Sequence, residues 1–228
     1  MSLRSLIGGL LGGRVTPAAE TSRIVELGTD VAALLLFHLG NAAMLPKAGQ
    51  VLAQTHPGSD AITLSACIIA AQFVMIGVAW GVGTAVTAGY GRKTIFLVAL
   101  AVLPIRGLLF SFTSNPYGVV AIQLLDGVAA GIFGVIAILI ASDLMRGTGR
   151  FNFAHLVALC VGVGAGMSNL ISGFVVQYFG YPVGFLFLAT IALAALLFFA
   201  LMMPETRGDD ESVQAAVGAK TILSGATA

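Results

Sequence analysis

The sequence is poor in charged residues. Of its 228 residues, 9% are Asp, Glu, Lys or Arg, while 58% are hydrophobic. A typical soluble domain has about 25% charged residues. So few charges cannot cover a surface that faces water, and we expect most of the surface to face lipid. The net charge of +1 gives no basic field of the kind that binds nucleic acid.

Cysteines and catalytic motifs are also scarce. The two cysteines, Cys67 and Cys160, lie inside apolar runs, and we interpret them as small buried hydrophobic residues. The sequence has no Gly-x-Ser-x-Gly elbow, His-Glu-x-x-His helix or Gly-x-x-x-x-Gly-Lys-Ser/Thr loop. These absences argue against a hydrolase, a zinc protease and a nucleotide-hydrolysing subunit. We therefore expect no enzyme activity, no metal site and no cofactor.

Long apolar runs are what the sequence does contain. Six windows are long enough for a helix to cross a bilayer; they cover residues 31–54, 61–87, 94–113, 117–143, 152–178 and 182–203. The runs lack the period-two alternation of barrel strands. The sequence thus predicts an all-α integral membrane protein. Its six-helix domain, residues 29–207, follows a polar lead-in, residues 1–28, and precedes a polar tail, residues 208–228.

Positive charges gather on one side of the predicted bundle. Because consecutive loops alternate sides, one side receives Arg4, Arg14, Arg23, Arg92, Lys93, Arg146, Arg150, Arg207 and Lys220. The other side has only Lys47, near the end of the first helix. By the positive-inside rule, both termini are expected in the cytoplasm. We expect a multi-pass protein of the bacterial inner (plasma) membrane.

Two further ionisable residues, Arg106 and Asp126, fall inside predicted spans. Each costs about 2.5–3.5 kcal/mol on insertion scales, so each needs a reason. Counted from the loop that joins their helices, their depths differ by roughly 5 Å, which an arginine side chain can bridge. We predict an ion pair. It either ties two helices together, the slightly favoured interpretation, or leaves Asp126 protonatable and coupled to transport.

Polar residues share faces on the first and fourth predicted helices. His38 and Asn41 are three residues apart, as are Gln123 and Asp126, so each pair lies on one helix face. Pro46 is expected to kink or break the first helix. A kinked helix with a polar face suits the wall of a cavity, although an isolated histidine such as His38 is more often a packing residue.

Small residues also recur at the four-residue spacing that lets helix backbones approach closely. The pairs are Gly77 and Gly81, Gly127 and Gly131, Ala130 and Gly134, and Gly162 and Gly166. This pattern is typical of helix bundles in membranes and does not by itself indicate transport.

Several segments resemble the C-terminal half of a major facilitator superfamily (MFS) transporter, helices seven to twelve of twelve. Phe37–Pro46 looks like the seventh helix of a bacterial group in this superfamily, and Leu103–Gly107 and Gln123–Gly127 look like its ninth and tenth helices. Gly89–Lys93 occupies the place of a short basic cytoplasmic loop, and Pro204–Arg207 is similar to the family's ending after the twelfth helix.

The resemblance implies a substrate cavity between two six-helix halves, near the middle of the membrane. The seventh and tenth helices would line it with His38, Asn41, Gln123 and Asp126. The cytoplasmic loop motif would be Gly91, Arg92 and Lys93. The Asp-Arg pair that usually precedes this motif is replaced by Ala88 and Gly89. Gating by this loop is therefore not implied.

Three functions are left open. The chain could pair with a separately encoded half, or with a second copy of itself, and transport a small molecule with or without protons. It could be a truncated transporter with little activity, or a membrane scaffold without transport. The polar residues inside the spans argue against a scaffold. The expected partners are the lipid bilayer, a small-molecule substrate and a second half; the substrate itself is not indicated.

Overall fold

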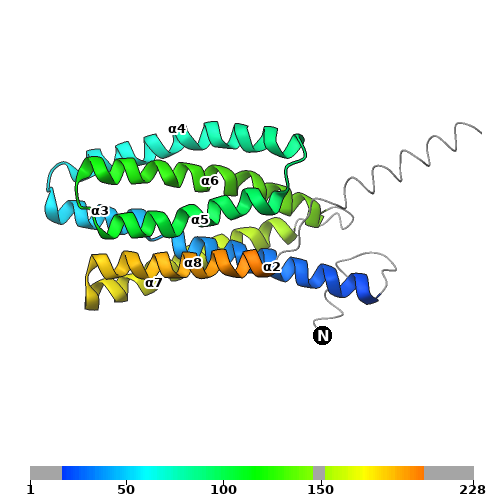
Figure 1. The fold of residues 1–228 in the computed structure, drawn as a ribbon. Coiled ribbons are helices and arrows are strands. Elements are labelled where there is room, and N and C mark those ends of the chain that lie inside the picture. Colours follow the sequence, from blue (N-terminus) through cyan, green and yellow to red (C-terminus); the bar gives the residue numbers. More distant parts are fainter. Residues whose placement is uncertain (1–16, 146–151, 203–228) are drawn as a thin grey trace, which may run out of the picture.

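The computed structural model describes residues 17–145 and 152–202, and within them it is helical, with no strand. The described residues form seven helices, whose arrangement Figure 1 shows. They are α2 (Pro17–Asn41), α3 (Met44–Thr55), α4 (Asp60–Thr87), α5 (Arg92–Ser111), α6 (Pro116–Met145), α7 (Asn152–Phe179) and α8 (Tyr181–Met202).

Six stretches of these helices are long and apolar enough to cross a membrane. They are Val31–Thr55, Asp60–Thr87, Lys93–Ser111, Pro116–Leu139, Val157–Phe179 and Tyr181–Met202. The prediction of an all-α membrane protein with six spans is confirmed. The first span combines the end of α2 with α3, and each of the other five lies within one helix.

The beginning of the chain differs from the prediction. Helix α2 begins at Pro17, so residues 17–28 of the predicted polar lead-in are helical and continue into the first span. Three predicted segments lie outside the described residues. They are the start of that lead-in, the loop with Arg146 and Arg150, and the tail together with the preceding Pro204–Arg207.

The first span is broken where α2 gives way to α3. Pro46 lies in the first turn of α3, where proline is tolerated. It has no N–H to donate to the carbonyl of Ala42, four residues earlier, and its ring crowds that carbonyl. The predicted break is therefore present, and it falls at Ala42 and Ala43, ahead of the proline itself.

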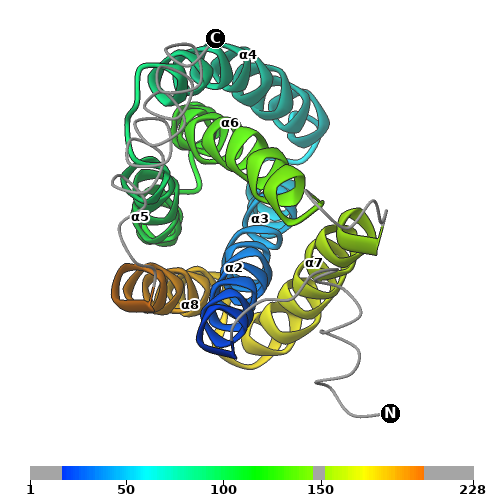
Figure 2. The ribbon, with the colours of Figure 1, turned by 90° about the vertical axis from the view of Figure 1, so that its right-hand side faces the viewer.

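The helices pack in two groups that meet along α5 and α8. Helix α4 packs along α6, and α5 joins α6 to α8. Helix α2 lies between α7 and α8, as the end-on view in Figure 2 shows. The connections α3–α4, α5–α6 and α7–α8 all lie at one end of the bundle, at the left of Figure 1. We call this the turn end. There, α7 and α8 are joined by Gly180 alone, whose φ of 82° favours glycine.

One of the predicted small-residue pairs brings two helices close together. A Cβ atom at Gly127 of α6 would overlap the carbonyl oxygen of Ala71 and come 2.7 Å from the Cβ atom of Val74, both on α4. A Cβ at Gly131 would come 2.9 Å from the carbonyl oxygen of Met75. Hydrogen at these positions is what lets α4 and α6 touch.

The other glycine pairs face open space. Nothing lies within 4 Å of a Cβ atom built at Gly77, Gly81, Gly162 or Gly166. The first two residues are on α4 and the last two on α7. These two small-residue faces are therefore available for another helix to approach.

Large apolar side chains cover much of the outer surface, as expected for contact with lipid. On α4 and α7 alone the exposed ones are Ile62, Ile68, Ile69, Phe73, Ile76, Trp80, Leu159, Val163, Met167, Leu170, Phe174, Tyr178 and Phe179. Cys67 and Cys160 are buried free thiols, as predicted.

The interior contains two apolar clusters. The first includes Phe37, Leu103 and Ala129; the second includes Met44, Phe110 and Ile122 and lies nearer the turn end. Both clusters have members on α5, on α6 and on the broken first span. Along each of these segments, one or two helical turns separate the last residue of one cluster from the first residue of the other. Arg106, Asn41, Gln123 and Asp126 fall in the interval between the clusters, by their positions along the same helices.

Candidate functional site

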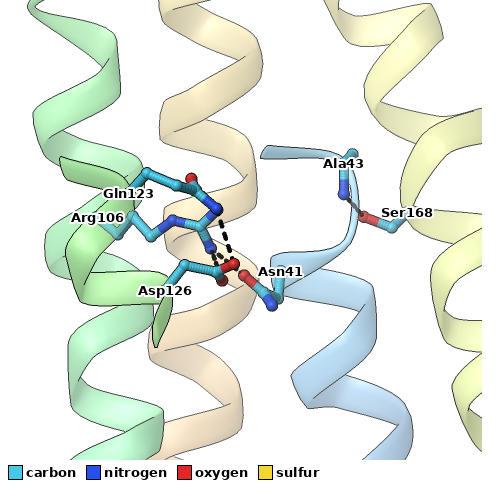
Figure 3. Close-up of polar contacts among 6 residues, drawn as sticks. All are labelled: Asn41, Ala43, Arg106, Gln123, Asp126 and Ser168. Carbon is cyan, nitrogen blue, oxygen red and sulfur yellow. Dashed lines mark hydrogen bonds and ion pairs between the residues drawn. The ribbon is translucent and has the colours of Figure 1, made fainter. Parts of the chain in front are cut away.

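A group of four polar side chains lies at this middle level of the bundle. We call Asn41, Arg106, Gln123 and Asp126 the polar cluster. Asn41 is the last residue of α2, Arg106 is in the second half of α5, and Gln123 and Asp126 are in α6. Three membrane-spanning segments thus each contribute a polar group to one point, as Figure 3 shows.

Arg106 is the centre of the polar cluster. Its Nη1 atom lies 2.6 Å from Oδ1 of Asp126, forming an ion pair, and also donates to Oδ1 of Asn41. Its Nη2 atom donates to Oε1 of Gln123 at 3.0 Å. The guanidinium lies over the Phe110 ring, 5.5 Å from its centroid, so an apolar neighbour closes one side.

Gln123 connects the arginine to the acid. While its Oε1 accepts from Arg106, its Nε2 donates to Oδ2 of Asp126 at 2.8 Å. This bonding pattern uses the amide oxygen as acceptor and the amide nitrogen as donor, and it occupies both carboxylate oxygens of Asp126. The carboxylate is held in a fixed direction by two donors.

The two charged members of the cluster differ in exposure. The side chain of Arg106 is 1% exposed, whereas that of Asp126 is 21% exposed. A buried charge is tolerated when it is paired and hydrogen-bonded. Arg106 meets both conditions through Nη1 and Nη2, while its Nε has no partner among the described residues. Asp126 is paired but keeps part of its side chain on the surface of the described bundle.

The described part of the chain contains no candidate metal centre. No three His, Cys, Asp or Glu residues come together there in a way that could hold a metal ion. The polar cluster offers hydrogen-bond donors and acceptors and one ion pair, a set that suits binding and proton exchange.

The break in the first span is held from both sides. On one side, Asn41 accepts a hydrogen bond from Arg106 of α5. On the other, the backbone N–H of Ala43 donates to Oγ of Ser168 of α7 at 3.1 Å, as Figure 3 shows. An amide released by a helix break needs such a partner in a buried place.

The role of Ser168 was not predicted. The one available signal was Pro46, which predicts that a neighbouring helix must supply partners to an interrupted backbone. The sequence does not say which residue of which helix supplies them.

His38 does not join the polar cluster, although it is three residues from Asn41. Its ring stands edge-on to Phe133, with centroids 4.9 Å apart, and edge-on to Phe37 at 5.3 Å. Its Nε2 atom is buried and has no hydrogen-bond partner among the residues that the structure describes. In this structure His38 is part of an aromatic contact between α2 and α6.

The basic loop motif lies at the end of the bundle opposite the turn end. Residues 88–91 connect α4 to α5, and Gly91 immediately precedes α5, which begins at Arg92. Gly89 has a φ of 83°, a backbone conformation that an arginine rarely adopts. The loop here is therefore a glycine turn without an acid, and Lys93 is half-buried.

Comparison with known proteins identifies relatives of the chain. It is 43% identical over 202 residues to two Mycobacterium tuberculosis proteins, from strains Oshkosh and H37Rv, each named an uncharacterized MFS-type transporter. The match covers 88% of this chain and 47% of each relative, so the chain spans about half the length of the curated relatives it matches. No protein-family model and no solved structure matches it. With six helices able to span a membrane and this similarity to proteins named MFS-type transporters, the chain is a multi-pass integral protein of the plasma membrane.

Proposed function

We propose that the chain carries a small molecule across the plasma membrane by secondary active transport, as the C-terminal type of MFS half. Asn41, Gln123 and Asp126 line the substrate and proton path, and Arg106 holds them in place. Two kinds of finding support this: the names of the relatives and the position of a polar cluster between two apolar clusters.

The observation that carries the proposal is the unequal exposure within the ion pair. Complete burial of an ion pair costs hydration that the attraction between its members need not repay, and Asp126 keeps an open face that a proton or a ligand can reach. Here Arg106 is enclosed while a fifth of the Asp126 side chain is open. Protonation of Asp126 would remove the charge that attracts Arg106 and loosen the contact between α5 and α6. Proton binding and helix movement would thereby be coupled.

His38 is the fourth residue of the proposed path. Its Nε2 is buried without a partner among the described residues and lies between α2 and α6, the two helices that carry the rest of the path. A small rotation away from Phe133 would make that nitrogen available to a proton or a substrate. Gly91, Arg92 and Lys93 are proposed to lie at the cytoplasmic side, where they set the charge of the entrance.

A second six-helix half is part of the proposal. The relatives are about twice as long as the chain, and the small-residue faces at Gly77 and Gly81 and at Gly162 and Gly166 are open. Such faces let a further helix pack closely. The second half is a further part of a longer chain, a separate chain, or a second copy related by a two-fold axis along the membrane normal.

The test is proton-coupled transport in liposomes. The purified protein is reconstituted with a pH-sensitive dye inside the vesicles and a pH gradient across the membrane. Sugars, monocarboxylates and organic cations are then added one at a time. We expect one class to produce a proton flux with wild-type protein and none with Asp126→Asn, because the amide cannot take up the proton.

Asp60→Asn is the matched control, since Asp60 begins α4 at the turn end, far along the chain from the polar cluster. It should transport like wild type. Full activity of Asp126→Asn would refute the role of Asp126. Absence of flux with every compound, from protein that is folded and paired with its second half, would refute transport itself.

A further inference from the structure

Lys47 is a buried cation that the polar cluster does not use. It lies in the first turn of α3, and the residue is 8% exposed. No described residue forms an ion pair or a hydrogen bond with its ammonium group. Burial of most of the side chain reduces the water around the ammonium group, and a nearby anion would compensate for that loss. Within the described residues the ammonium group has no counter-charge.

The ammonium group points toward α7. A Cβ atom at Gly173 would lie 3.7 Å from Nζ of Lys47, so the glycine leaves room beside the ammonium group. About one turn earlier along both segments, Ala43, which directly precedes α3, is bonded to Ser168 of α7. Lys47 and Gly173 thus extend the contact between the first span and α7 by about one helical turn beyond Ala43 and Ser168.

A hydroxyl group is available at this level. Ser172 precedes Gly173 and is fully buried. Its Oγ donates to the carbonyl oxygen of Asn169 at 3.4 Å, which is long for a hydroxyl donor. Such a weak bond is easily exchanged for a bond to a stronger acceptor, such as a carboxylate.

The net charge of the described membrane-spanning segments indicates how many negative charges the bound anion should carry. Between the helix ends, the described spans contain two cations, Lys47 and Arg106, and one anion, Asp126. Asp126 neutralises Arg106 at 2.6 Å. One positive charge is left over, and a monovalent anion balances it. A phosphate group carries about 1.5–2 negative charges at pH 7 and would leave the site negative.

We infer that Lys47, with Ser172, binds the carboxylate of a monovalent organic acid, and that this acid is the transported substrate. The second statement rests on the proposed transport function; the first does not. The competing occupant is an acidic side chain of the second half, which would fill the same place permanently.

Binding is measured by thermal unfolding of the purified full chain. Acetate, butyrate and benzoate are titrated at constant sodium concentration, with chloride as the balancing anion and inorganic phosphate as the comparison. We expect at least one monocarboxylate to raise Tm with a saturable dependence, since a ligand of the folded state stabilises it. Phosphate should bind more weakly.

Substitution of the lysine should remove this effect. In Lys47→Met the apparent Kd should weaken about tenfold or more, because a charge-assisted contact is lost. Thr87→Val is the control, since Thr87 is exposed at the end of α4, at the opposite end of the bundle, and its hydroxyl bonds only within that helix; it should bind like wild type. Equal shifts in wild type and Lys47→Met, or no shift with any of the three acids, would overturn the inference.

A measurement on wild-type protein covers the case in which Lys47→Met does not fold. Acetic anhydride acetylates accessible amines, and mass spectrometry reads each lysine separately. The monocarboxylate should slow acetylation of Lys47 and leave that of Lys93 unchanged. Equal rates at Lys47 with and without the acid would contradict the site, and would be the result if an acidic residue of the second half occupied it.

The two proposals can fail separately. Monocarboxylate binding at Lys47 without transport of any compound would leave the site intact and refute the transport function. Transport of another class of compound, with no carboxylate binding, would refute this inference and leave the transport function intact.

Discussion

Arg106 and Asp126 form an ion pair between α5 and α6 in which the arginine side chain is buried and the aspartate side chain is partly exposed. Nη1 of the arginine lies 2.6 Å from Oδ1 of the aspartate, and the side chains are 1% and 21% exposed. The arginine also holds Asn41 and Gln123. The pair therefore organises a polar level between two apolar clusters, and its energetics can be tested directly.

Replacing one member of the pair should be worse than replacing both. Asp126→Leu leaves Arg106 buried without its counter-charge and is expected to cost about 3–5 kcal/mol of stability. Asp126→Leu combined with Arg106→Met removes both charges and should recover most of that loss. Unfolding in detergent, followed by loss of helical signal, measures the three variants against wild type. Additive losses in the double variant would mean that the two residues are not energetically coupled.

Gly127 should tolerate no side chain, because α4 lies against it. Gly127→Val would push a side chain into Ala71 and Val74, and overpacking of this kind costs about 1–3 kcal/mol. Gly134→Val, on the same helix but facing open space, is the matched control and should change Tm little. Equal shifts in the two variants would show that α4 and α6 are not in close contact.

Ser168→Ala should loosen the break in the first span. The Ala43 N–H would lose its partner in a buried place, at a cost of about 1–3 kcal/mol. Hydrogen exchange at Ala43 should become faster, while Ser168→Thr, which keeps the hydroxyl, should restore it. Ser65→Ala removes an exposed hydroxyl on α4 and should leave exchange at Ala43 unchanged. Unchanged exchange in Ser168→Ala would contradict the assigned bond.

The fold was predictable because each span is a long apolar run with clear turn residues between runs. The approach of Arg106 to Asp126 also followed from the sequence, since both lie at similar depth on consecutive helices. Side-chain direction did not follow. His38 and Asn41 are three residues apart, yet the break at Ala42 and Ala43 lets Asn41 turn to Arg106 while His38 packs on Phe133.

Contacts between distant helices were also beyond the sequence. Ser168 and Ala43 are 125 residues apart, and no local pattern connects them. Likewise, the spacing of Gly127 and Gly131 is the same as that of Gly162 and Gly166, but only the first pair contacts another helix within the described part of the chain. Spacing indicates that a close approach is allowed, and the packing decides where it occurs.

The most direct test of the account is the protein mass of the complex extracted from its native membrane, measured by light scattering that separates protein from detergent. One chain has a mass of 23.3 kDa. The account predicts a protein mass of about twice this value, from two copies or from the chain and a second half of similar size. A particle that contains a single chain and nothing else would contradict the claim that this half works only with another.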